Sequence, residues 1–234
     1  MLAYDCAWAV THCEASRASF SYFTSLTYWG LGFYFLAAAI HTFTYARSGV
    51  PLLDRAPLSV RRLLQALHSL LYTTIVVYPF IVTIVYWGIL YSGHWFDLEI
   101  DAWSNISEHM LNSVLAFFEI VVPRTDPPPL IHMIWIVFIL ALYLSLAYVT
   151  HATKGFYTYS FLDPAKGGIV AAYCFGIAVG GIIVFGVVWG LIRLRKWLTE
   201  EKLGRRGKFS SPPPQFEVQS AGGVHDLERG SEKK

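Results

Sequence analysis

Long runs of apolar residues constrain the fold of this chain more than any other feature of its sequence. A membrane-spanning helix needs about 20 mostly apolar residues, and five stretches meet that requirement. They cover residues 20–45, 63–91, 103–122, 130–150 and 167–194. A transmembrane barrel would instead show alternating segments of about ten residues. The runs therefore predict an all-α fold, a polytopic transmembrane helix bundle of about five spans.

The placement of charge supports the same fold class. Only 15% of the 234 residues are charged, compared with about 25% in a typical soluble domain. Fifteen of the 34 charged residues lie at or after Arg195, so the preceding part cannot cover a water-exposed surface. We expect an N-terminal segment over 1–19 and a basic, disordered tail over 195–234. A soluble enzyme and a nucleic-acid partner are excluded as the main interpretation.

Basic residues between the predicted spans give an orientation. The loops on one side hold eight Lys or Arg residues, and those on the other side hold three. Because Lys and Arg accumulate in cytoplasmic loops, we expect a cytosolic C-terminus. The acidic loop at 97–101 is then outside or lumenal. The chain is expected to be a multi-pass protein of an endomembrane or of the plasma membrane.

The 103–122 span is the least apolar of the five and carries a polar stripe. Asn105, His109, Asn112 and Ser113 are spaced so that they share one face of a helix. Such a face must look inward, because polar groups are expensive in lipid. The stripe is either a hydrogen-bonded seam between helices or part of a reactive pocket. In the pocket, His109 would be the general base, since imidazole titrates near neutral pH.

A base of this kind needs a nucleophile, and the first span offers hydroxyl groups near its outer end. These are Ser21, Thr24, Ser25 and Thr27. At 1.5 Å per residue, Thr24 lies about 7.5 Å along the axis from Ser19, and His109 about 9 Å from Trp103. The two side chains therefore share a depth in the membrane. Whether their helices are neighbours depends on the tertiary structure.

Histidines on both sides of the membrane allow a different chemistry. Three are expected toward the inner side and three toward the outer side, namely His41, His68 and His132, and His94, His109 and His151. Two histidines at equal depth on neighbouring helices would suit a b-type haem. The three cysteines are too scattered for a zinc site or a disulfide framework. A hydrolase built on a hydroxyl and an imidazole needs no cofactor.

Several of these residues occur in the order and spacing of a known family. The motifs are Phe23-Thr24 before an aromatic-rich stretch, Trp103-x-Asn105-x-x-x-His109 with Glu119 ten residues beyond the histidine, and His151-x-x-x-Gly155-x-x-x-Tyr159. Together they resemble the androgen-induced protein and androgen-dependent TFPI-regulating protein family. Its members are multi-span membrane hydrolases that cleave fatty acid esters of hydroxy fatty acids.

The resemblance implies that Thr24 is the nucleophile and His109 the catalytic histidine. With the polar stripe, it also suggests a set of supporting or substrate-binding residues, namely Trp103, Asn105, Asn112, Ser113, Glu119, His151 and Tyr159. Thr27 is a second threonine in the nucleophile segment and stays an alternative. The expected partners are a lipid ester substrate and membrane lipids. A non-catalytic membrane protein, such as a transporter or an assembly partner, is the alternative function.

Overall fold

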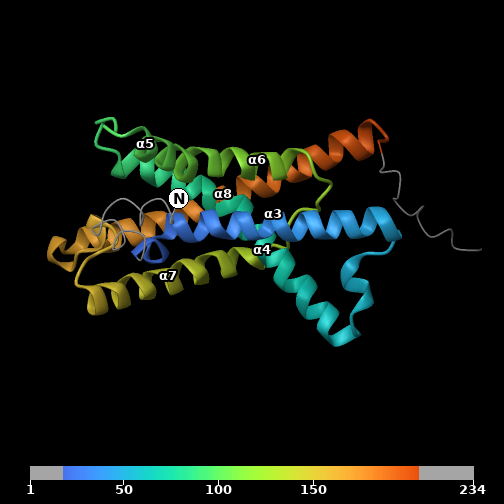
Figure 1. Cartoon of the computed structure of the whole chain (residues 1–234), viewed down its shortest axis with the longest axis horizontal. Coiled ribbons are helices and arrows are strands. Elements are labelled where there is room, and N and C mark those ends of the chain that lie inside the picture. Colours follow the sequence, from blue (N-terminus) through green and yellow to red (C-terminus); the bar gives the residue numbers. More distant parts are fainter. Residues whose placement is uncertain (1–17, 206–234) are drawn as a thin grey trace, which may run out of the picture.

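The computed structural model describes residues 18–205, which contain helices and no strand. Four helical stretches are long and apolar enough to cross a membrane. They are α3 (Phe23–Ser48), α4 (Leu58–Val85) with its extension η3 (Tyr86–Leu90), α7 (His132–Lys154), and α8 (Gly168–Lys196) with its extension η7 (Trp197–Lys202). The predicted all-α bundle is confirmed for this part of the chain (Figure 1).

A fifth helical stretch carries the polar stripe and is built from three consecutive pieces. These are α5 (Glu99–Ile106), the π-helical turn η4 (Ser107–Leu111) and α6 (Asn112–Val121). Together they run without a break from residue 99 to 121, which corresponds to about 34 Å of helix. The stretch begins four residues before the predicted boundary at Trp103.

Two other helices extend beyond the predicted spans. α4 begins at Leu58, directly after Pro57, five residues before the predicted span, because proline is well suited to the position at which a helix starts. α8 continues as helix past residue 194, and η7 extends it to Lys202. The first eight residues of the predicted disordered tail are therefore helical. Residues 206–234 of that tail and 1–17 of the N-terminal segment lie outside the described residues.

Glycines end two of the long helices. Gly49 after α3 and Gly155 after α7 both have left-handed backbone angles, with φ of 67° and 77°. In each case the glycine N–H donates to a carbonyl four residues earlier, at Tyr45 or His151. Only glycine adopts this conformation without a steric penalty. The caps fix the points at which the chain turns back across the bundle.

α4 is the central helix of the bundle. It contacts α3, α6, α7 and α8, and its second half is buried from Tyr72 to Val82 apart from two positions, Thr74 and Phe80. The other helices contribute one or a few side chains each to the same core, including Leu31, Ile120, Ile136, Phe185, Val188 and Ile192. The outer faces carry exposed large apolar side chains such as Phe33, Phe43, Ile134, Phe175 and Ile183. Exposed apolar surface on this scale is what a lipid environment favours.

The bundle has two ends, which we name after residues that lie there. At the Thr24 end lie the start of α3, the end of α4, α5, the end of α7 and the start of α8, on the left of Figure 1. Three 3-10 turns also lie at this end, η1 (Ser19–Ser21), η5 (Ser160–Leu162) and η6 (Pro164–Lys166). At the Arg195 end lie the turn η2 (Leu52–Arg55), the loop after α6 and the end of α8.

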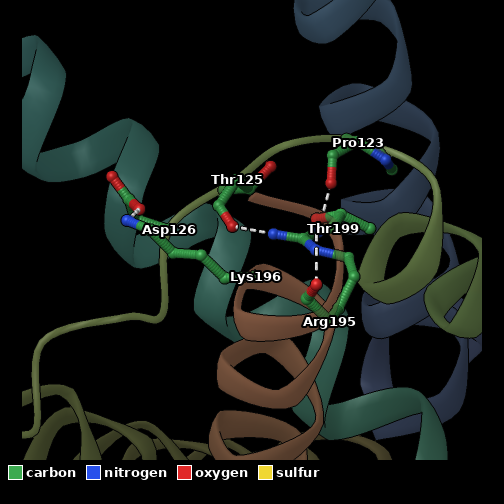
Figure 2. A network of polar contacts seen from close by, with 6 residues as sticks. All are labelled: Pro123, Thr125, Asp126, Arg195, Lys196 and Thr199. Carbon is green, nitrogen blue, oxygen red and sulfur yellow. Dashed lines mark hydrogen bonds and ion pairs between the residues drawn. The ribbon is translucent and has the colours of Figure 1, made fainter. Parts of the chain in front are cut away.

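Arg195 anchors the end of α8 to the loop after α6 (Figure 2). Its guanidinium donates to the carbonyl oxygens of Ile120, Pro123 and Thr125, and the bond to Ile120 measures 2.9 Å. The neighbouring Lys196 pairs with Asp126. A helix C-terminus such as that of α6 leaves carbonyl groups without partners, and a cation there satisfies them. This anchoring explains why α8 stays helical where the sequence predicts a tail.

Candidate functional site

Five segments that are distant in the sequence meet around one cavity at the Thr24 end. The cavity has a volume of about 190 Å³ and lies among α3, α4, α7, α8 and the loop through η5. Thr24 forms part of its wall, together with Tyr86, Tyr143 and Tyr159. The remaining wall is apolar, with Ile, Leu, Val, Ala, Phe and Cys174 side chains. The cavity therefore offers an apolar volume with a few hydroxyl groups at one side.

Thr24 is in the first turn of α3 and is buried. Its hydroxyl oxygen lies 3.4 Å from the hydroxyl oxygen of Tyr159, a residue 135 positions further along the chain. At the start of a helix, no intrahelical carbonyl is in place to accept the hydroxyl proton of this residue, in contrast to threonines within a helix. The hydroxyl of Thr24 therefore faces a partner and a cavity instead of its own backbone.

Thr27 is held in a different way. Its hydroxyl donates to the carbonyl oxygen of Thr24 at 2.7 Å and lies 3.5 Å from the amide nitrogen of Asn112, which donates to it. Thr27 does not line the cavity that contains Thr24, but a second cavity of about 310 Å³ between α3, α4 and α7. Because its proton is engaged with the backbone, Thr27 has the geometry of a structural threonine.

His109 lies in the π-helical turn η4, whose wider turn is rare and is frequently found at functional sites. Its ring nitrogen Nδ1 lies 3.0 Å from the carbonyl oxygen of Asn105. A carbonyl can only accept, so Nδ1 carries the proton in this contact and Nε2 is left as the basic nitrogen of the neutral ring. Thr83 fixes the same turn by donating to the His109 carbonyl at 2.6 Å.

Tyr86 connects His109 to the cavity. The rings of Tyr86 and His109 have centroids 3.8 Å apart, and Tyr86 also forms part of the cavity wall. Tyr86 lies at the first position of a second π-helical turn, η3. No hydrogen bond joins Thr24 to His109, although the residues next to them, Ser25 and Glu108, contact each other through their side chains. The two candidate catalytic residues thus lie on adjacent helices and at the same end of the bundle.

The C-terminal part of the polar stripe, Asn112 and Ser113, serves helix packing. Ser113 lies 2.6 Å from the hydroxyl oxygen of Thr83 on α4, and Asn112 is fully buried against Thr27 on α3. Tyr28 adds a longer contact of 3.5 Å to Ser107. This half forms the hydrogen-bonded seam that was one of the two interpretations. Asn105 and His109, in the other half, contact Tyr86 instead.

Tyr159 is the residue of the loop after α7 that enters the site. Its backbone is extended, with φ of −133° and ψ of 138°, and directs the ring toward α3. Burial raises the pKa of the Tyr159 phenol above its usual value, and hydrogen bonds with Thr24 and with the backbone of Phe23 oppose this increase only in part. The phenol is therefore neutral at physiological pH and able to donate.

Among the sequence-based candidates, only Thr24 and Tyr159 line this cavity, and three of the others contact neither residue. The Trp103 side chain is 61% exposed and points away from the core. Glu119 is buried in α6, where it accepts a hydrogen bond of 3.2 Å from Tyr34, and it does not line the cavity. His151 stacks on Tyr157 with centroids 3.8 Å apart and also lies outside the cavity wall. The family motifs do not determine which side chains line the cavity, and a role for these three residues in the site stays a prediction.

Two tyrosines in the cavity wall were not among the candidates. Tyr86 follows a proline-containing apolar span, and Tyr143 lies in the middle of another. Tyr143 donates to the carbonyl oxygen of Ser21 at 3.0 Å, which ties the segment before Thr24 to α7. A tyrosine inside a predicted span is a usable signal, because its hydroxyl needs a partner when buried. Many tyrosines of this chain lie inside predicted spans, so this signal does not single out Tyr86 and Tyr143.

Comparison with known proteins adds no further constraint. No protein-family model, no curated protein and no solved structure matches this chain.

Proposed function

We propose that this protein is an integral membrane hydrolase that cleaves lipid esters, with Thr24 as nucleophile and His109 as general base. The observation that carries the proposal is the position of Thr24 in the wall of an apolar cavity, on a helix adjacent to the one that presents His109. The cavity would accommodate an apolar chain of the substrate. The resemblance in sequence motifs suggests fatty acid esters of hydroxy fatty acids as the substrate class.

The reaction proceeds through an acyl-enzyme. The Thr24 oxygen forms a bond to the ester carbonyl carbon while its proton passes to Nε2 of His109. The carbonyl electron pair moves to the carbonyl oxygen. Collapse of this intermediate breaks the bond to the alcohol oxygen, which takes the proton from His109. Water then adds to the acyl-enzyme in the same way and releases the fatty acid and free Thr24.

Asn105 and Tyr86, which both contact His109, have supporting roles in this mechanism. The Asn105 carbonyl holds His109 in the tautomer with a basic Nε2, as the third member of a catalytic triad does. Tyr86 contacts the imidazole and also borders the cavity that Thr24 borders. Catalytic hydrogen bonds are often long in ligand-free enzymes and shorten when substrate binds. The membrane supplies the substrate, and no cofactor takes part.

A covalent fluorophosphonate probe on the purified protein in detergent tests the proposal. Wild type should be labelled, and Thr24→Ala should not. In hydrolysis of a long-chain fatty acid ester, Thr24→Ala and His109→Ala should each abolish turnover, and the double variant should be no worse, because residues that act as a unit are non-additive. Absence of both labelling and hydrolysis in wild type would refute the proposal.

The alternative is a non-catalytic membrane protein, either a transporter or an assembly partner. It is favoured by the seam of Ser113, Asn112 and Thr27, which uses polar groups for packing alone. The same fluorophosphonate experiment separates the two functions. Under this alternative, the wild-type protein would bind a lipid without releasing any fatty acid.

The cellular arrangement follows from the distribution of charge. In this proposal the Thr24 end faces the outside of the cell or the lumen of an endomembrane compartment, and the Arg195 end faces the cytosol. The ester is then cleaved near the outer interface, where water reaches the site while the acyl chains stay in the apolar layer.

A further inference from the structure

The Tyr159 side chain is clamped by aromatic rings from three segments. Its ring is parallel to that of Phe161, with centroids 5.3 Å apart. Tyr22, just before α3, contacts it edge-on at 6.0 Å, and Tyr143 on α7 lies 6.4 Å away. Packing of this kind leaves one rotamer for the ring. The phenol group is therefore placed in advance beside Thr24, without any ligand to order it.

The phenol oxygen of Tyr159 has polar neighbours on α3 and α7. The first backbone amides of α3, at Phe23 and Thr24, face this oxygen, and amides at the start of a helix have no intrahelical acceptor. The Tyr143 side chain also contacts this phenol. The Thr24 hydroxyl oxygen lies 3.4 Å away, and either hydroxyl can donate in this contact. The Tyr159 O–H can therefore be directed at the Thr24 oxygen.

This position has a consequence for the intermediate of ester cleavage. When the Thr24 oxygen bonds to the ester carbon, the former carbonyl oxygen and the Thr24 oxygen share that carbon and are close neighbours. A donor aimed at the Thr24 oxygen is then also within reach of the negative charge that develops on the carbonyl oxygen. We infer that Tyr159 is a catalytic residue whose hydroxyl donates to this oxyanion. The inference rests on the proposed function.

The decisive variant is Tyr159→Phe, which removes the hydroxyl and keeps the ring against Phe161. We expect kcat for a long-chain fatty acid ester to fall by about 10²–10³-fold, the usual cost of losing one oxyanion donor. KM should change by no more than about twofold, because the hydrogen bond forms only in the transition state. Tyr157→Phe is the matched control, since it removes a phenol from the same loop outside the cavity wall.

A second measurement separates catalysis from a structural role. A fatty alkyl trifluoromethyl ketone forms a hemiketal with a hydroxyl nucleophile, and the adduct carries the negative oxygen that Tyr159 would bind. Tyr159→Phe should raise the dissociation constant of this inhibitor by about the same factor by which it lowers kcat. The matched alkyl methyl ether, which forms no adduct, should bind equally well to the variant and the wild type.

Three results would overturn the inference. The first is a Tyr159→Phe variant with the kcat of Tyr157→Phe. The second is a Tyr159→Phe variant that binds the ether and the ketone more weakly by the same factor and has a lower melting temperature. That result would indicate a packing role. In both cases the proposed function stands if wild-type hydrolysis still requires Thr24. The third is wild-type hydrolysis that does not require Thr24, which would overturn the inference and the proposed function together.

Discussion

Thr24 and Thr27 are three residues apart in one helix, and their local surroundings give their hydroxyls different chemistry. Thr27 donates to a backbone carbonyl and accepts from Asn112, so its proton is used. Thr24 lies in the first turn of α3, faces Tyr159 and borders the apolar cavity. The geometry therefore favours Thr24 as the nucleophile of the proposed hydrolase.

Substitutions at the two threonines should separate their roles. Thr24→Ala should lower kcat for fatty acid ester hydrolysis by at least about 10³-fold, as for other nucleophiles. Thr24→Ser should retain part of the activity, because a hydroxyl remains at the same position. Thr27→Ala should lower kcat less. It removes the hydrogen bond from Asn112, which should lower the free energy of unfolding by about 1 kcal/mol. Full activity in Thr24→Ala with loss in Thr27→Ala would move the nucleophile to Thr27.

The two histidines on α7 provide a second comparison at this scale. His132 is buried at the Arg195 end, with Nδ1 2.7 Å from the hydroxyl oxygen of Thr73. His151 stacks on Tyr157, in the loop that positions Tyr159. Turnover, measured at equal amounts of folded protein, should fall more in His151→Ala than in His132→Ala. Thermal stability should fall more in His132→Ala, because that variant removes a buried hydrogen bond. The opposite order of turnover would contradict the placement of the site.

At the level of helices, polar contacts of Arg195 and Lys196 hold α8 against the loop after α6. Arg195 donates to one carbonyl in the last turn of α6 and to two in the loop that follows, while Lys196 makes an exposed ion pair beside it (Figure 2). Planar guanidinium groups suit such multiple donation, and charged hydrogen bonds of this type stabilise more than exposed ion pairs.

The stability of Arg195→Ala can therefore be compared with that of Lys196→Ala, its neighbour. Arg195→Ala should lower the free energy of unfolding by about 2 kcal/mol, because it leaves carbonyl groups without a donor. Lys196→Ala should cost no more than about 1 kcal/mol, since its pair with Asp126 is solvent-exposed. Both can be measured by thermal unfolding in detergent. Equal effects of the two substitutions would show that Arg195 does not anchor α8.

The cavity between α4, α7 and α8 gives a prediction about substrate length. Ala178 on α8 forms part of its wall, whereas Ala172 on the same helix is exposed and outside it. Ala178→Phe should reduce kcat/KM for long-chain esters by about 10-fold or more, because a large side chain takes up the space for the acyl chain. Short-chain esters should be affected less, and Ala172→Phe should leave both substrates unchanged. If Ala178→Phe affected the two chain lengths equally, the acyl chain would not bind in this cavity.

For the whole molecule, the two ends of the bundle differ in composition. The Thr24 end contains the cavity and the candidate catalytic residues, and the Arg195 end contains most of the basic residues of the loops. A positively charged end of a helical bundle is expected to face the cytosol. The two ends would then be exposed to different compartments.

Topology can be measured independently of activity. A tag at the C-terminus should resist protease in sealed right-side-out vesicles, because the charge distribution places it in the cytosol. A tag inserted in the loop at 97–101 should be cleaved in the same vesicles. Digestion of the C-terminal tag from outside would reverse the orientation and place the candidate site on the cytosolic side.

The sequence alone determined the helical class of the protein and predicts a shared depth for Thr24 and His109. Both follow from local properties, namely the length of apolar runs and the rise per residue. The polar stripe on the 103–122 span also identified Asn105, His109, Asn112 and Ser113, since polar groups in lipid must find partners.

Only the tertiary structure decided which of these residues meet. Most of the long helices are apolar on every side, because lipid and core favour the same side chains, so periodicity does not reveal the inward face. For that reason the family motifs suggest Trp103, Glu119 and His151 as supporting residues, and only the structure shows that they lie outside the cavity wall. Tyr159 contacts Thr24 across 135 residues, and Tyr86 reaches His109 from another helix. Contacts between distant segments depend on how the helices pack, which no single segment encodes.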